Sequence, residues 1–170
     1  GIDEINFLTS VTLYTSYKNK VDGKSGTISC KKKDVLNLPY ESYLENRDAV
    51  LDGYKIAREF LLQNEYVFRQ RDLPYTTQLI PLSATCAYLG KKTCNEPNTK
   101  KILERWYWCG ILGEMYGGAN ETRYANDIED IVDEVYKHPS QMRTVNSSFF
   151  SATRLLTLQT RLSAAYKGIM

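Results

Sequence analysis

Apolar residues recur at spacings of three and four along almost the whole chain, and no run of six residues alternates between apolar and polar side chains. The first spacing gathers apolar side chains on one face of an α-helix, whereas a half-buried strand needs the second pattern. Helices are predicted after Pro74, from about residue 146, and over 2–18, 41–65, 97–116 and 121–137. We therefore predict an all-α fold in which residues 1–170 form a single-domain bundle of six or seven helices.

Proline, glycine and asparagine mark where several of these helices begin, end or bend. Pro74 suits a first helical turn, where its missing N–H costs nothing. Pro81 falls inside the helix that follows and is predicted to kink it, and Gly90 is predicted to end that helix. Gly117-Gly118 breaks the pattern again, and Asn120 suits the cap of the next helix. A short apolar turn is expected to lead up to Pro39.

The length of 170 residues is enough for a self-sufficient core, because such a chain buries about 70% of its unfolded surface. No run of 18 apolar residues predicts a transmembrane helix. The start, Gly1-Ile2-Asp3-Glu4, lacks an initiator methionine and the basic region of a signal peptide. We therefore expect a cytoplasmic fragment of a larger multidomain chain, with no contact to a membrane.

Histidine and cysteine are too few, or too widely spaced, for several kinds of site. The one histidine, His138, cannot supply a multi-histidine metal centre, an HNH-type nuclease site or a zinc-finger ligand set. Four cysteines include no C-x-x-C pair, and Cys86 and Cys94, the two nearest, lie eight residues apart. In a chain of this length they are typical of reduced cytosolic thiols, so we expect no metal and no cofactor.

The net charge of +2 hides a strong separation of charge along the sequence. Five acids crowd into residues 127–134, and only basic charges follow. The acids are Asp127, Glu129, Asp130, Asp133 and Glu134, and the later basic residues are Lys137, Arg143, Arg154, Arg161 and Lys167. Arg154 and Arg161 lie two helical turns apart and share a face. This basic segment either contacts nucleic acid or an acidic neighbouring domain, or it packs against the acidic helix of the same chain.

Two further runs are candidates for binding. Lys31-Lys32-Lys33 is either a solvated face or a contact for phosphate or an acidic partner. In Arg105-Trp106-Tyr107-Trp108, aromatic side chains follow a basic one, as they do where bases stack on a protein. Trp106 and Trp108 point about 200° apart on a helix, however, so they cannot form one platform. We expect this helix to pack into the core.

The loop before the acidic helix is also a candidate. Its two glycines permit positive φ, and Glu121 and Arg123 follow at the start of a helix. The loop is either a connector that Arg123 locks through an ion pair with Glu104 or Glu114, or a contact for a ligand or DNA. Nearby Cys109 lacks the activating base or cation that a catalytic thiolate needs.

Several longer segments, in this order and spacing, resemble one protein family. They are Leu73–Leu82 (LPYTTQLIPL), Arg105–Trp108 (RWYW), Tyr116–Arg123 (YGGANETR), Ala152–Leu158 (ATRLLTL) and Ser163–Lys167 (SAAYK). Together they resemble the helical middle-to-C-terminal region of GmrSD-like proteins, which are related to modification-dependent (type IV) restriction endonucleases. The resemblance spans about residues 5–167, and its motifs are of the packing kind.

The family joins an N-terminal ParB-like nucleotide-hydrolysing domain to a C-terminal HNH-type nuclease domain. This chain has neither the Asp-Gly-Gln-Gln-Arg motif of the first nor the nuclease histidines of the second. No catalytic residue of the family therefore carries over to it. The resemblance implies a connector, a helical bundle that couples nucleotide hydrolysis to DNA cleavage and that takes part in phage defence.

These observations predict a non-catalytic scaffold whose partners are neighbouring domains of the same chain and the DNA backbone. The candidate contact residues are Lys31, Lys32, Lys33, Arg105, Glu121, Arg123, Arg154 and Arg161. The alternative is an independent helical nucleic-acid-binding protein. A third hypothesis is a small hydrolase that uses Cys109 or Glu121. The sequence leaves the oligomeric state open.

Overall fold

The computed structural model describes residues 3–64, 72–118, 120–136 and 141–149, together with Thr153 and Tyr166. This part contains seven α-helices, α1 to α7, one short 3₁₀ turn, η2, before α4, and no strand. The all-α prediction is therefore confirmed for the described residues. None of their helices is long and apolar enough to cross a membrane.

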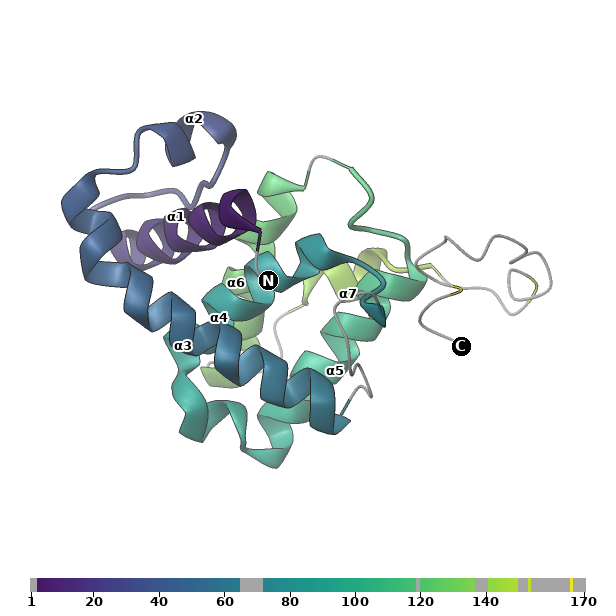
Figure 1. The fold of residues 1–170 in the computed structure, drawn as a ribbon. Coiled ribbons are helices and arrows are strands. Elements are labelled where there is room, and N and C mark those ends of the chain that lie inside the picture. Colours follow the sequence, from purple (N-terminus) through teal and green to yellow (C-terminus); the bar gives the residue numbers. More distant parts are fainter. Residues whose placement is uncertain are drawn as a thin grey trace.

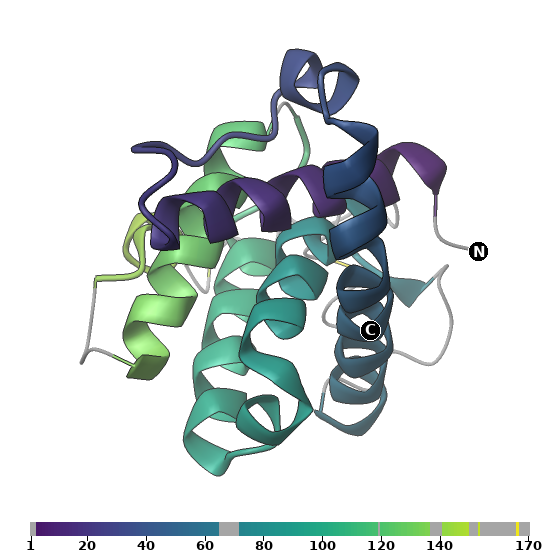
Figure 2. The same cartoon turned by 90° about the vertical axis from the view of Figure 1, so that its left-hand side faces the viewer.

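Helix α1 spans Glu4–Val21 and begins at Asp3. The Asp3 carboxylate accepts hydrogen bonds from the backbone N–H groups of Ile5, at 2.9 Å, and Asn6, at 3.1 Å. These bonds satisfy two of the N–H groups that the first turn leaves unpaired. In Figure 2, α1 crosses the other long helices instead of running alongside them.

Helix α2, Lys32–Leu36, is a short helix in the segment for which the sequence predicts a turn. The carboxylate of Asp34 accepts from the backbone N–H of Lys31 at 3.0 Å and from the hydroxyl of Ser29 at 2.6 Å. This local cap stabilises the start of the short helix.

Helix α3, Tyr40–Asn64, agrees with the predicted range 41–65 within one residue at each end. It packs closely on α4, because Gly53 presents no side chain at the crossing. A Cβ atom there would lie 2.2 Å from the backbone oxygen of Ser83 and 2.8 Å from the Cβ of Ala87. The hydroxyls of Tyr54 and Ser10, 2.9 Å apart, join α3 to α1.

Helix α4, Leu79–Cys94, is the central helix and contacts α1, α3, α5 and α6 (Figure 1). The predicted kink at Pro81 is wrong. The turn η2, Thr76–Gln78, precedes α4, so Pro81 lies in its first turn, where a missing N–H is tolerated. Gly90 does leave the helical conformation, with φ 74° and ψ 163°, but residues 91–94 resume it.

Helix α5, Pro97–Leu112, ends four residues earlier than predicted. The chain turns back after it, with Glu114 at φ 52° and the N–H of Met115 donating to the Gly110 carbonyl at 3.0 Å. This turn brings the ring of Tyr116 onto Gly110, where an added Cβ would lie 2.5 Å from the ring. Gly110 therefore permits the return of the chain onto α5.

Helix α6, Glu121–Tyr136, matches the predicted range 121–137. The backbone carbonyl of Asn120 accepts from the N–H of Tyr124 at 2.9 Å, as expected of the residue before a helix. Helix α7, Arg143–Ser147, lies just before the predicted last helix and ends where that helix is predicted to begin. Apart from Thr153 and Tyr166, the predicted continuation beyond residue 149 lies outside the described residues.

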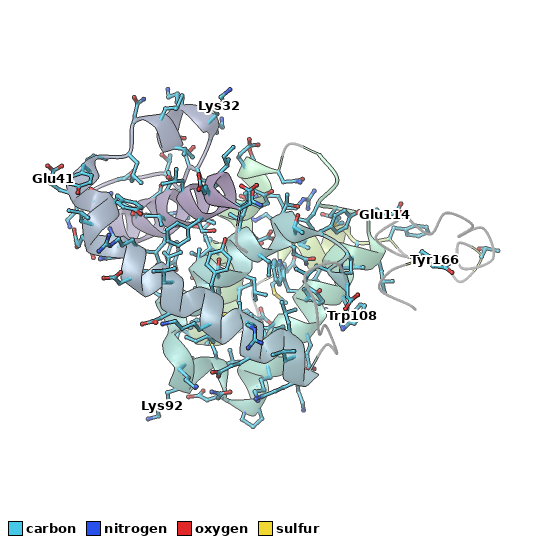
Figure 3. All side chains as sticks on the ribbon, in the orientation of Figure 1. Lys32, Glu41, Lys92, Trp108, Glu114 and Tyr166 are labelled. Atoms are coloured by element: carbon cyan, nitrogen blue, oxygen red, sulfur yellow. The ribbon has the colours of Figure 1, made fainter. Side chains whose placement is uncertain are left out.

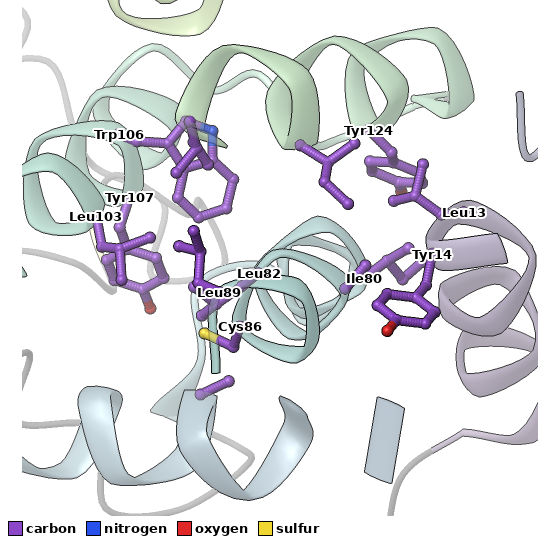
Figure 4. Packing of buried hydrophobic residues seen from close by; sticks show 14 of the residues in the cluster. Leu13, Tyr14, Ile80, Leu82, Cys86, Leu89, Leu103, Trp106, Tyr107 and Tyr124 are labelled. Atoms are coloured by element: carbon purple, nitrogen blue, oxygen red, sulfur yellow. The ribbon is translucent and has the colours of Figure 1, made fainter. Parts of the chain in front are cut away.

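The core lies on both sides of α4 (Figure 4). On one side, Leu82, Cys86 and Leu89 of α4 face the buried side chains of α5. Trp106 and Tyr107 are fully buried and Trp108 is partly buried, so the prediction that this helix packs into the core is confirmed.

Candidate functional site

The three predicted lysines of α2 are exposed and lie close to the start of α6. Lys31, Lys32 and Lys33 all face solvent. The preceding residue, Cys30, is buried, and its thiol donates to the backbone carbonyl of Glu121 at 3.7 Å. The fold therefore brings this lysine run and Glu121, two of the predicted contact sites, into one neighbourhood.

Arg105 lies on the exposed side of α5 and belongs to a different part of the surface. In Figure 3, Lys32 lies at the top of the molecule, whereas Trp108, one helical turn after Arg105, lies at the lower right. The predicted contact residues of α2 and α5 therefore do not form one continuous site.

Arg123 is turned toward the interior. Its Nη1 donates to the hydroxyl of Thr144 at 3.4 Å and contacts the sulfur of Met115 at 3.5 Å, while its buried Nε has no hydrogen-bond partner in the described structure. The guanidinium thus links α6 to α7. Arg154 and Arg161, like His138, lie outside the described residues.

Two acids of the acidic helix, Glu129 and Asp130, pair with cations of the chain itself. Arg143 of α7 donates to both carboxylate oxygens of Asp130, at 2.7–3.1 Å, and to Glu129 at 2.9 Å. Lys20 of α1 also pairs with Glu129. Burial alone would raise the pKa of Glu129, but the hydrogen bonds from Lys20 and Arg143 lower it overall. For Arg143, this pairing supports the intramolecular alternative.

One of the five clustered acids is buried beside these ion pairs, which the sequence analysis did not predict. Asp127 is only 1% exposed. One of its oxygens accepts from the hydroxyl of Tyr116 and the other from the hydroxyl of Thr144, each at 2.6 Å. Its carboxylate therefore joins α6 to α7 and to the end of the turn after α5.

Burial raises the pKa of Asp127 to about 6, against the hydrogen bonds from Thr144 and Tyr116 and the charge of Arg123, which lower it. The indole N–H of Trp106 also favours the charged form, although no hydrogen bond of ordinary geometry reaches it. Burial and the nearby Asp127 together raise the pKa of Tyr116 well above its ordinary value.

A signal for the buried aspartate was present in the sequence. Tyr124, Ile128 and Ile131 form the predicted apolar stripe of α6, and Asp127 lies three residues after the first and four before the last. That spacing places its carboxylate on the buried face. A carboxylate on an apolar face implies buried hydrogen-bond donors.

The arrangement favours a structural role for these polar groups. Both oxygens of Asp127 already accept hydrogen bonds from protein hydroxyls, and Asp130 is held by Arg143. Among the described residues, no three His, Cys, Asp or Glu side chains are grouped so that they could hold a metal ion. Burial, with smaller effects from Glu121 and Asp34, raises the pKa of Cys30 to about 12, which disfavours its thiolate.

Searches of protein-family models, curated proteins and solved structures found no match to this chain.

Proposed function

We propose that this chain is a non-catalytic helical scaffold of a GmrSD-like DNA restriction protein, which couples neighbouring domains and contacts the DNA backbone. The proposal rests on the resemblance of its sequence motifs and on one structural observation. The polar groups best suited to chemistry, Asp127 and Asp130, are buried and hold helices together, whereas the predicted contact residues Lys31–Lys33 and Arg105 face solvent.

The coupling role is tested by the gene that encodes the chain. If this is a connector, the coding sequence contains the Asp-Gly-Gln-Gln-Arg motif of the nucleotide-hydrolysing domain upstream of Gly1. Downstream of Met170 it contains the His-x-x-Pro motif that marks the HNH-type nuclease domain of the family. A coding sequence limited to these 170 residues would refute the scaffold and leave the independent nucleic-acid-binding protein as the better hypothesis.

Contact with DNA is tested by fluorescence anisotropy with a labelled duplex of about 30 base pairs. We expect binding in low salt whose affinity falls steeply as salt rises from about 50 mM, because each phosphate contact releases counterions. Absence of binding in low salt would refute this part of the proposal.

The non-catalytic assignment is tested by incubating the chain with nucleotides, ester substrates and DNA. We expect no turnover. Turnover that is lost in Cys109→Ser or Glu121→Gln, with the fold unchanged by circular dichroism, would instead establish the hydrolase hypothesis.

A further inference from the structure

The corner between α4 and α5 concentrates positive charge, of which the sequence analysis singled out only Arg105. Residues 91–105 contain five cationic side chains and two acids, a net charge of +3, whereas the whole chain carries only +2. The cations are Lys91, Lys92, Lys100, Lys101 and Arg105, and the acids are Glu96 and Glu104. A local charge larger than that of the entire chain identifies this corner as a distinct electrostatic feature.

The fold places these cations on either side of the turn that joins α4 to α5. Only Asn95 and Glu96 separate α4 from α5. The backbone N–H of Asn95 donates to the carbonyls of Lys91, at 3.1 Å, and Lys92, at 3.2 Å, so the turn is tight. On α5, Arg105 lies about 12 Å along the axis from Pro97, at about 1.5 Å per residue. Lys91, Lys92, Lys100 and Lys101 therefore lie within about two helical turns of this connection, and Arg105 lies about one turn further along α5.

Most of this charge is not used inside the molecule. Lys91 pairs with Glu59 of α3 at 2.9 Å. Lys92, Lys101 and Arg105 are exposed, and none of them forms an ion pair with another described residue. Lys101 and Arg105 are four residues apart on one face of α5, and the partly exposed Trp108 follows on the same face.

The lysine run of α2 also has two acidic residues beside it. The carboxylate of Asp34 is held at the backbone N–H of Lys31, and Glu121 lies beside the preceding residue, Cys30. Figure 3 places Lys32 and Lys92 at opposite ends of the view. The two lysine-rich regions are therefore separate surfaces that can be tested independently.

We propose that the α4–α5 corner is the surface with which this chain contacts the backbone of duplex DNA. The inference rests on the proposed function and identifies the site of its DNA contact. Exposed cations that lack an internal partner lose no ion pair when they bind phosphates, and each phosphate that they neutralise releases counterions.

The experiment compares three triple variants, each of which removes three positive charges. The corner variant is Lys92→Gln/Lys101→Gln/Arg105→Gln. The matched control, Lys24→Gln/Arg47→Gln/Lys55→Gln, also removes two lysines and one arginine, all of them exposed and each paired with a nearby acid. The third variant is Lys31→Gln/Lys32→Gln/Lys33→Gln.

Binding to the labelled duplex is measured by anisotropy between about 50 and 300 mM salt, the range over which phosphate contacts weaken most visibly. Thermal melting of each variant checks its fold.

Intrinsic fluorescence gives a second readout, because the chain has only two tryptophans. Trp106 is buried, so Trp108 is the tryptophan that a ligand at this corner can approach. We expect DNA to change the fluorescence of the wild type and not that of Trp108→Phe.

We expect the corner variant to bind about ten-fold more weakly at about 100 mM salt, with the slope of log K against log salt reduced by about 2 to 3. The matched control should keep an affinity within about two-fold of the wild type, since its cations contact acids and not phosphates.

Equal losses in the corner variant and the matched control would overturn the inference, because net charge alone would then explain binding. A loss confined to the α2 variant would also overturn it while leaving DNA contact intact. No binding by the wild type would refute the proposed DNA contact itself.

Discussion

Replacing Asp127 by asparagine should remove a pH dependence that the fold imposes on its own stability. The pKa of this carboxyl rises from 3.8 to about 6 on burial. A folded-state pKa above the unfolded value means that ionisation opposes folding. The contribution of the protonated Asp127 to the free energy of unfolding is therefore fully present below pH 3.8 and is lost as the pH rises through about 6. The shift corresponds to about 3 kcal/mol in total, of which about 2 kcal/mol falls between about pH 4 and pH 7.

The asparagine side chain of this variant has nearly the same shape as the aspartate and carries no charge. The hydroxyls of Tyr116 and Thr144 can rotate to accept from the amide as well as donate to its oxygen. We therefore expect Asp127→Asn to gain about 2 kcal/mol relative to the wild type on going from about pH 4 to pH 7. Urea unfolding at half-unit steps of pH measures this difference directly.

The control is Asp48→Asn, which neutralises an exposed aspartate on α3 and should follow the wild-type profile. Carbon-13 NMR of the Asp127 carboxyl should show a midpoint near pH 6. The reasoning would be refuted if the wild type gained stability relative to Asp127→Asn with rising pH. That result would mean that Arg123 and the two hydroxyls outweigh burial.

Three further substitutions test the packing and pairing described above. Tyr116→Phe removes a 2.6 Å hydrogen bond to the buried carboxylate of Asp127. Urea unfolding should show a loss of about 1.5 to 3 kcal/mol in the free energy of unfolding at about pH 7, and a smaller loss at about pH 4. Gly53→Ala should lower the free energy of unfolding by about 1 to 3 kcal/mol, because the added Cβ would lie 2.2 Å from the backbone oxygen of Ser83. A gain in stability would show that α3 and α4 move apart at no cost. Arg143→Ala should lower the free energy of unfolding by about 2 kcal/mol in low salt and by less in high salt, because it removes the ion pairs with Glu129 and Asp130. Arg143→Lys should lie between this variant and the wild type. A loss that does not depend on salt would contradict the pairing.

The apolar periodicity predicted the helices well because each repeat spans several turns of one element. The stripe through Tyr124, Ile128 and Ile131 has the same phase in sequence and in α6. The kink predicted at Pro81 is wrong for a local reason. The effect of a proline depends on its distance from the helix start, and the preceding 3₁₀ turn Thr76–Gln78 sets that start.

The candidate site was predictable only where exposure follows from residue type. Lysines such as Lys32 lie at the surface because burying an ammonium group is costly. The direction of Arg123 and the burial of Asp127 depend instead on Thr144, which follows Asp127 by 17 residues and belongs to a helix of five residues. So short a helix has no periodic signal of its own, and its contacts therefore come only from the tertiary structure.

The central position of α4 also has a consequence for synthesis of the chain. Helices α1 and α3 contact it from earlier in the sequence, and α5 and α6 contact it from later. A nascent chain that ends at Cys94 lacks both α5 and α6, so the part of α4 that these helices cover has no partner until α6 is complete at Tyr136. During those 42 further residues the unfinished core is exposed to aggregation, so this chain should depend on chaperones most while α5 and α6 are being made.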